Sequence, residues 1–228
     1  MPSLASPSPA SSASTAPPAS FTSGGIDLLV RMAASHPIRP ACERFYFLRH
    51  GQTRCNARRI FQSADEPLSE LGLAQAARAA TALAGEPIAS IVCSDMARAL
   101  TTARTVAVPH GLTPLAQAGL RERHFGALIG TSSADLDWAC EPEGGETLGA
   151  FVARKRPALE AALAAPAPVL VVAHGGTLYV LAALLGVPID VSVLGNAQPL
   201  RFDRQGDRWH VRPLREAAEG SAGAAAIA

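Results

Sequence analysis

The chain has no run of about 20 consecutive apolar residues, the length that a helix needs to cross a bilayer. Its first 25 residues carry no charged side chain and no continuous apolar run, so they lack both parts of a secretory signal. The 20 basic and 19 acidic residues leave a net charge of +1, without the basic excess typical of nucleic-acid binding. We therefore expect no membrane partner and no nucleic-acid partner.

Cysteine is also scarce. Four cysteines in 228 residues are too few for a disulfide framework, and no two have the C-x-x-C spacing of a zinc site. The histidines show neither H-x-H nor H-E-x-x-H spacing. The sequence therefore predicts no metal site, no cofactor and a reducing, cytoplasmic setting.

Composition divides the chain into four parts. Residues 1–25, rich in Ala, Ser and Pro, are expected to form a disordered arm, because they have too little apolar surface to bury. Residues 26–41 are expected to hold a short amphipathic helix over 26–34 and a proline-containing linker. One domain is expected over residues 42–215, followed by a flexible tail over 216–228.

Within that domain, short apolar runs alternate with helical patterns. Strands are predicted over residues 45–48, 88–93, 169–173, 200–202 and 208–211. Helices are predicted over residues 68–83, 96–108, 147–164 and 178–185, with Ser69 as an N-cap. This alternation predicts an α/β sheet covered on both faces, whose ligands collect beyond the carboxyl ends of the strands.

A histidine follows the first predicted strand, in the motif L-R-H-G-Q-T of residues 48–53. Gly51 lets the backbone approach a ligand closely because it has no Cβ, and the planar guanidinium of Arg49 matches phosphate oxygens. Taken alone, His50 would more often be a satisfied polar residue at a strand end. These neighbours favour a phosphate site.

A second motif, V-V-A-H-G-G-T over residues 171–177, repeats this arrangement of strand, histidine, glycine and helix start. The free N–H groups of a helix N-terminus attract anions. By itself His174 is equally well explained by packing beside a glycine turn. Each of the two histidines is followed by glycine rather than by a carboxylate ligand, so phosphate binding fits the pair better than a metal.

With four further segments, these motifs resemble the histidine phosphatase superfamily, in its phosphoglycerate-mutase-like branch. The resemblance extends from Phe45 to about Phe202, and six segments in the family's order are far more specific than one R-H-G. The segments are R-H-G-Q-T with Asn56, D-E-P-L-S-E-L-G (65–72) with Q-A (75–76), S-D-M-A-R-A (94–99) with T-A (102–103), E-R-H-F-G-A-L (122–128) with Gly130, Pro142 with G-E-T (145–147), and H-G-G (174–176). The family's fold implies three α/β/α layers around a mostly parallel central sheet.

The resemblance also implies a division of labour. Neutral His50 would attack phosphorus and become a phosphohistidine, while its other ring nitrogen donates to a backbone carbonyl. Arg49, Arg98 and His174 would surround the transferring group and stabilise its charge. Glu122 would protonate the leaving oxygen, which requires burial or a nearby dianion to keep it protonated at working pH.

Substrate contacts are implied for Gly51, Asn56, Gln62, Ser63 and Gly175. Three arginines after the nucleophile, at positions 54, 58 and 59, either favour anionic substrates or belong to a solvated loop.

Residues 131–146 favour a phosphatase over a mutase. Mutases of this family have a longer insertion there, with basic residues that grip the glycerate, whereas this segment is short and contains no Lys or Arg. The sequence also differs from the family pattern at Tyr179, where many relatives have an arginine.

The resulting prediction is a metal-independent phosphomonoester phosphatase that acts on a small phosphorylated metabolite, with a homodimer left open. Mutase-type transfer is the alternative. A non-catalytic phospholigand-binding module and a protein phosphatase acting on phosphohistidine or phosphotyrosine are further alternatives.

Overall fold

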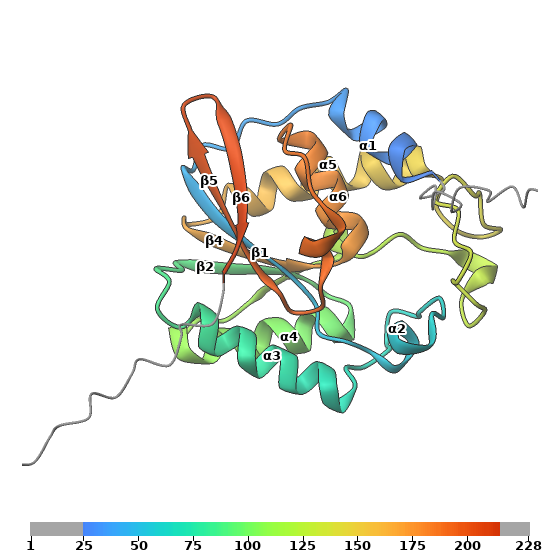
Figure 1. Ribbon diagram of the computed structural model, residues 1–228, viewed down its shortest axis with the longest axis horizontal. Coiled ribbons are helices and arrows are strands. Elements are labelled where there is room, and N and C mark those ends of the chain that lie inside the picture. Colours follow the sequence, from blue (N-terminus) through green and yellow to red (C-terminus); the bar gives the residue numbers. More distant parts are fainter. Residues whose placement is uncertain (1–24, 215–228) are drawn as a thin grey trace, which may run out of the picture.

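A six-stranded sheet forms the centre of the computed structural model, which describes residues 25–214 (Figure 1). Its strand order is β3-β2-β4-β1-β5-β6. The strands are β1 (Arg44–Arg49), β2 (Ser90–Ser94), β3 (Leu115–Gln117), β4 (Val169–Ala173), β5 (Pro199–Gln205) and β6 (Arg208–Pro213). The four strands from β3 to β1 are mutually parallel, and β5 and β6 extend the sheet antiparallel. The predicted mostly parallel sheet is confirmed.

Helices cover both faces of this sheet (Figure 1). One face carries α1 (Ile26–Ala34), α5 (Leu148–Leu163) and α6 (Gly175–Leu184), and the other carries α3 (Glu70–Leu83) and α4 (Ala97–Ala107). The short α2 (Arg54–Arg58) follows β1, and four 3₁₀ turns lie between these elements: η1 (Val108–His110), η2 (Ala118–Leu120), η3 (Gly126–Leu128) and η4 (Val191–Leu194). The predicted three layers are thus present. Within residues 25–214, no helix has the length and apolar character that spanning a membrane requires.

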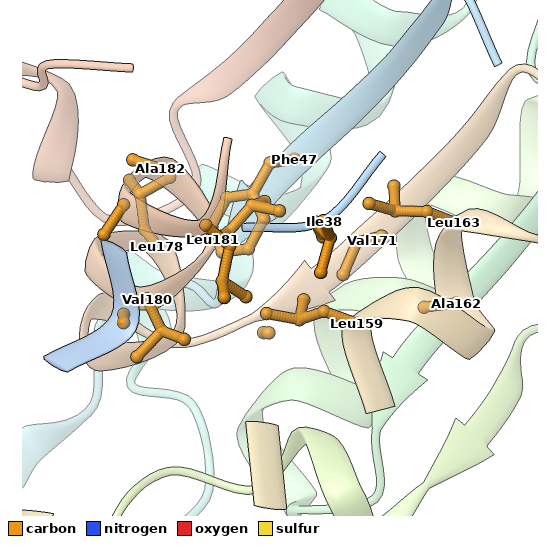
Figure 2. Close-up of a cluster of buried hydrophobic side chains, with 14 of the residues drawn as sticks. Ile38, Phe47, Leu159, Ala162, Leu163, Val171, Leu178, Val180, Leu181 and Ala182 are labelled. Carbon is orange, nitrogen blue, oxygen red and sulfur yellow. The ribbon is translucent and has the colours of Figure 1, made fainter. Parts of the chain in front are cut away.

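The core has two halves because side chains alternate along the central strands. Phe45 and Phe47 of β1 point into the cluster beneath α1, α5 and α6, whereas Tyr46 and Leu48 point toward α3 and α4. Strand β4 alternates in the same way. Figure 2 shows the first cluster, with Phe47 and Val171 of the sheet among side chains of α5 and α6. Burial on both faces explains why these strands are continuous apolar runs.

The amphipathic helix predicted over residues 26–34 forms, but it is not separate from the domain. Ile26, Leu29 and Ala33 are buried in the cluster shared with α5 and α6, and Ile38 joins them (Figure 2). The buried face of α1 therefore packs on the domain predicted over residues 42–215. The expected tail at 216–228 and the expected arm, except Gly25, lie outside the described residues.

Two elements have no counterpart among the sequence predictions. Strand β3 has three residues and α2 has five, so both are too short to show periodicity. Helix α6 begins at Gly175, three residues before its predicted start. Gly175 and Gly176, which the sequence suggested would form a connecting loop, belong to the first turn of the helix.

Two glycines allow α3 to dock against the loop after β1. A Cβ on Gly51 would lie well inside 3.0 Å of the Gly72 carbonyl oxygen, and a Cβ on Gly72 would clash equally with the Gln52 carbonyl oxygen. The side of Gly51 that lacks a Cβ therefore faces the backbone of α3. Packing against α3 is therefore one reason for a glycine at position 51, and a contact between Gly51 and a ligand stays a prediction.

This contact predicts an unusual effect of Gly72→Ala. Alanine normally stabilises a helix interior by about 0.5–1 kcal/mol relative to glycine, but here the new methyl group meets backbone that cannot move aside. We expect a loss of about 1–3 kcal/mol in unfolding free energy, measured by urea denaturation. Gly149→Ala in α5 is the control: its Cβ would meet only ordinary contacts at 3.6 Å or more, so it should stabilise. Stabilisation by both variants would contradict this account.

Candidate active site

The two motif histidines lie side by side because their strands are neighbours. Arg49, the last residue of β1, pairs in register with Ala173, the last residue of β4. The next residue on each strand is a histidine, and the ring centroids of His50 and His174 are 5.2 Å apart in an edge-to-face arrangement. Both lie beyond the carboxyl ends of parallel strands, where ligands of α/β sheets bind.

His50 is fixed in one orientation and one tautomer. Its Nδ1 lies 2.7 Å from the Gly51 carbonyl oxygen, which can only accept, so Nδ1 carries the proton and Nε2 keeps a free lone pair. Its own carbonyl accepts from Asn196 Nδ2 at 2.9 Å. Burial, together with Arg98 and Arg49, holds the pKa of His50 well below its ordinary 6.5. The ring is therefore neutral at neutral pH.

His174 is fully buried beside His50. Its Nε2 lies 2.9 Å from Ser94 Oγ at the end of β2, and its Nδ1 has no partner among the described residues. Burial, then Arg98 and His50, keep the pKa of His174 well below 6.5. A second neutral imidazole thus adjoins the first, with one nitrogen left for a ligand or water.

Two guanidinium groups converge on this pair. Arg49 is anchored by the Leu194 carbonyl at 2.6 Å, and Arg98, only 2% exposed, by the Ser63 carbonyl at 2.8 Å. Both Nε atoms lack a partner, and neither arginine has an ion pair within residues 25–214. Burial lowers the pKa of both, but arginine stays charged in proteins. Buried positive charge without a partner carboxylate is an arrangement suited to an anion.

Glu122 lies at the N-terminus of α6. Its Oε2 accepts from the Gly176 N–H at 2.9 Å and its Oε1 from the Arg123 N–H at 3.1 Å. A Cβ on Gly176 would stand 2.5 Å from both Glu122 Oε1 and the Trp138 ring, so only glycine leaves room for this carboxyl group. The second glycine after His174 therefore serves to place Glu122.

These groups line one cavity of about 290 Å³. Of the predicted site residues, it is lined by Arg49, His50, Asn56, Gln62, Arg98, Glu122 and Gly175. His174 is fully buried beside His50 and is not among the lining residues. Gly51 and Ser63 are not part of the lining: Gly51 packs on α3, and Ser63 lines a neighbouring cavity and contacts the site only through its carbonyl bond to Arg98. Of the three loop arginines, Arg59 alone lines this cavity.

Asn56 and Gln62 have their oxygens engaged by the protein. Asn56 Oδ1 accepts from the Thr53 N–H at 3.3 Å in the capping box of α2, and Gln62 Oε1 accepts from Thr53 Oγ1 at 2.8 Å. The amide nitrogens remain as donors toward the cavity, in keeping with an anionic ligand.

An aromatic wall was missed by the sequence analysis. Phe61, Phe125 and Trp138 line the cavity; the Phe61 and Phe125 rings are tilted with centroids 4.6 Å apart, and the Phe125 and Trp138 rings meet edge to face at 5.9 Å. The positions of Phe61 beside Gln62 and Phe125 within a motif offered a signal, whereas Trp138 offered none. Arg123 holds this wall: its guanidinium donates to the carbonyls of Glu146, Trp138 and Cys140.

The described part of the chain holds no group of three or more His, Cys, Asp and Glu side chains arranged to bind a metal ion. The residues that line this cavity include one neutral imidazole, four guanidinium groups and one carboxyl group.

Ser94→Ala tests the support of His174. The variant leaves a buried imidazole without its one hydrogen-bond partner, so we expect kcat/KM for phosphomonoester hydrolysis to fall about tenfold and stability to fall by about 1–3 kcal/mol. Ser90→Ala, on the same strand, removes only an exposed bond to the Pro166 carbonyl and should change neither quantity appreciably. Equal effects of the two variants would refute the role of Ser94.

Comparison with known proteins agrees with this geometry. The sequence profile of the histidine phosphatase superfamily, branch 1, matches residues 45–216. Glucosyl-3-phosphoglycerate phosphatase of Mycolicibacterium vanbaalenii is 35% identical over 184 residues, which are 68% of this chain and 81% of that protein. A protein of Yersinia pestis named "probable phosphoglycerate mutase GpmB" is 33% identical over 186 residues, 72% of this chain and 86% of its own length.

Solved structures show the same relationship. A mycobacterial glucosyl-3-phosphoglycerate phosphatase in complex with VO3 matches with a TM-score of 0.63 and 33% identity, over 75% of this chain and 97% of that one. The alpha-ribazole phosphatase of Shigella flexneri matches with a TM-score of 0.64 and 26% identity, over 75% and 95%. This chain belongs to branch 1 of the histidine phosphatase superfamily and is a phosphoric monoester hydrolase.

Proposed function

We propose that this protein hydrolyses phosphomonoesters by two in-line phosphoryl transfers, with His50 as the nucleophile. The observation that carries the proposal is the placement of a neutral His50, its Nδ1 proton held by the Gly51 carbonyl, between two buried guanidinium groups that have no carboxylate partner. Binding of a phosphate group supplies the negative charge that this site lacks.

In the first transfer, the Nε2 lone pair of His50 forms a bond to phosphorus as the ester oxygen leaves. Arg49 and Arg98 stabilise the charge on the equatorial oxygens, with His174 Nδ1 and the amide nitrogen of Asn56 as further contacts. Glu122 gives its proton to the leaving oxygen, so that an alcohol rather than an alkoxide departs. A positioned acid contributes about 10²–10⁴-fold to such a step.

In the second transfer, water attacks the phosphohistidine. Glu122, now a carboxylate, accepts a proton from the water, whose oxygen bonds to phosphorus while the bond to Nε2 breaks. Phosphate and neutral His50 result. With one water molecule consumed, the atoms and protons of this cycle balance.

His50→Ala should reduce release of phosphate from an aryl phosphate by more than 10³-fold, because it removes the atom that forms the covalent intermediate. Activity of the unaltered enzyme should persist in excess chelator. Acid-quenched samples of the unaltered enzyme should contain acid-labile, alkali-stable protein phosphate that His50→Ala lacks. His210→Ala, at an exposed site on β6, is the control and should leave all three measurements unchanged. Chelator-sensitive turnover, or turnover that survives His50→Ala, would overturn the proposal.

The substrate we propose is a small phosphorylated metabolite that enters along the aromatic wall. The wall offers flat apolar faces, on which sugar or aryl groups can lie, and Arg59 at the edge of the cavity can meet an anionic substituent. Glucosyl-3-phosphoglycerate, the compound named for the mycobacterial relatives, combines a sugar with an acidic group and is the first candidate.

The four cysteines are all free thiols, which supports a reducing, cytoplasmic setting.

The relationship to the Yersinia protein makes phosphoglycerate mutase activity the second candidate. The structure favours hydrolysis: residues 131–146 give the cavity only Ser133, Leu136 and Trp138, none of which can bind a carboxylate as a cation would.

Glucosyl-3-phosphoglycerate should therefore be hydrolysed with at least a tenfold higher kcat/KM than 3-phosphoglycerate, and 3-phosphoglycerate should not be isomerised at a comparable rate. Phosphate release and isomer formation, measured on the same samples, decide between the two activities. Isomerisation faster than hydrolysis would establish the mutase instead.

A further inference from the structure

Helix α1 precedes the part of the chain that the family profile matches, which begins at residue 45. Its first turn is firmly built: the Gly25 carbonyl accepts from the Leu29 N–H at 3.0 Å, and Ile26 and Leu29 are buried. The proposed mechanism makes no use of this helix. The way it packs nevertheless brings its first residue to the wall of the candidate site.

Gly25 lies against the backbone of the segment that carries Trp138. A Cβ on Gly25 would stand 2.1 Å from the Ala139 nitrogen, 2.7 Å from the Trp138 carbonyl carbon and 2.8 Å from Asp137 Oδ1. The first two are backbone atoms, which cannot rotate aside as the end of a long side chain can. Figure 1 shows this contact from outside, where the dark blue start of α1 lies beside the yellow loop that precedes α5.

The backbone conformation of Gly25 imposes the same requirement. Its φ is 76°, in the left-handed region that residues with a side chain seldom adopt. Gly111 has a similar φ of 63°, but a Cβ there would meet no atom within 4 Å. Close approach to a neighbour is therefore a property of Gly25 and not of the left-handed conformation itself.

The backbone around Trp138 is thus held from two directions. From one, the guanidinium of Arg123 donates to the carbonyls of Trp138 and Cys140. From the other, Gly25 packs against the nitrogen of Ala139, which lies between those two residues in the chain. Removing either support leaves this part of the segment with fewer contacts to fix its position.

The indole ring of Trp138 joins the cavity to the core cluster that α1 helps to form. It is half-buried, lines the cavity and borders Gly176. It also packs against the cluster that contains Ile26 and Leu29, and its centroid is 6.3 Å from that of Phe151 in the same cluster. Close packing transmits a displacement of α1 to this ring.

We propose that Gly25 is a positioning residue for Trp138: its contact with residues 137–139 holds the indole ring where the organic group of the substrate lies. The inference rests on the proposed function, which places that group on the aromatic wall. Arg49 and Arg98, proposed to bind the phosphoryl group, are anchored elsewhere by carbonyl groups. The contact made by α1 therefore sets the affinity for the organic group and leaves the chemical step unchanged.

Tryptophan fluorescence tests the contact without any enzyme assay. Trp138 and Trp209 are the two tryptophans of the chain, so Trp209→Phe leaves Trp138 as the only indole emitter. In this background Gly25→Ala should shift the emission to longer wavelength and increase quenching by acrylamide. Gly111→Ala is the matched control: it imposes the same backbone strain where no neighbour is met, and it should change neither quantity. An unchanged spectrum in folded Gly25→Ala would overturn the proposal.

The second measurement separates KM from kcat for two substrates. Gly25→Ala should raise KM for phenyl phosphate about three- to tenfold with little change in kcat, since it weakens binding of the phenyl ring alone. Ethyl phosphate has no ring to lie on the wall, so its kcat/KM should be the same in the variant and the unaltered enzyme. Gly111→Ala should alter neither substrate. Equal losses with both substrates would contradict the proposal, because they would indicate general damage to the site.

Trp138→Ala distinguishes failure of this inference from failure of the proposed function. It should raise KM for phenyl phosphate at least as much as Gly25→Ala does. No increase in Trp138→Ala would refute both the proposed contact of the substrate with the wall and the inference that rests on it. An increase in Trp138→Ala without one in Gly25→Ala would refute the role of Gly25 alone and leave the proposed function standing.

Discussion

The parallel pairing of β1 with β4 is the constraint on which the site depends. Because Arg49 and Ala173 are in register, the residues that follow them emerge at the same height, and His50 and His174 become neighbours although 124 positions separate them in the chain. A slip of one residue would turn one histidine to the opposite face of the sheet. The alternating burial of Phe45, Tyr46, Phe47 and Leu48 in the two halves of the core prevents that slip.

The charges buried at the site are the second feature on which its chemistry depends. The fold buries two guanidinium groups and two imidazoles in one place, and it supplies carbonyl oxygens rather than carboxylates to hold the arginines. The imidazoles consequently stay neutral, as a nucleophile requires. The only carboxyl group at the cavity, Glu122, is held by backbone N–H groups, so the arginines are left free for the phosphoryl group. Stability given up by burying uncompensated charge is recovered when the anion binds.

Much of this could be predicted from the sequence because strong local signals coincide with the functional positions. Residues 45–48 of β1 and all of β4 are apolar, a histidine follows the end of each strand, and Ser69 caps α3 as its sequence indicates. The contact of Gly51 with α3 was not predicted, because a glycine shows that space is needed but not which neighbour needs it. The place of Trp138 in the cavity wall could not be predicted, because its segment has no hydrophobic periodicity.

The aromatic wall of the cavity does not belong to the central sheet. Trp138 and its neighbours belong to a segment without strands or α-helices, which is tied to the domain by backbone hydrogen bonds to residues 59–61 and by bonds from Arg123 to its carbonyls. Since those bonds go to backbone, the side chains of this segment can be exchanged without altering its anchorage or the strands that carry the histidines. The proposed contacts to the part of the substrate beyond its phosphate therefore lie on a segment that is separate from the strands carrying the two histidines.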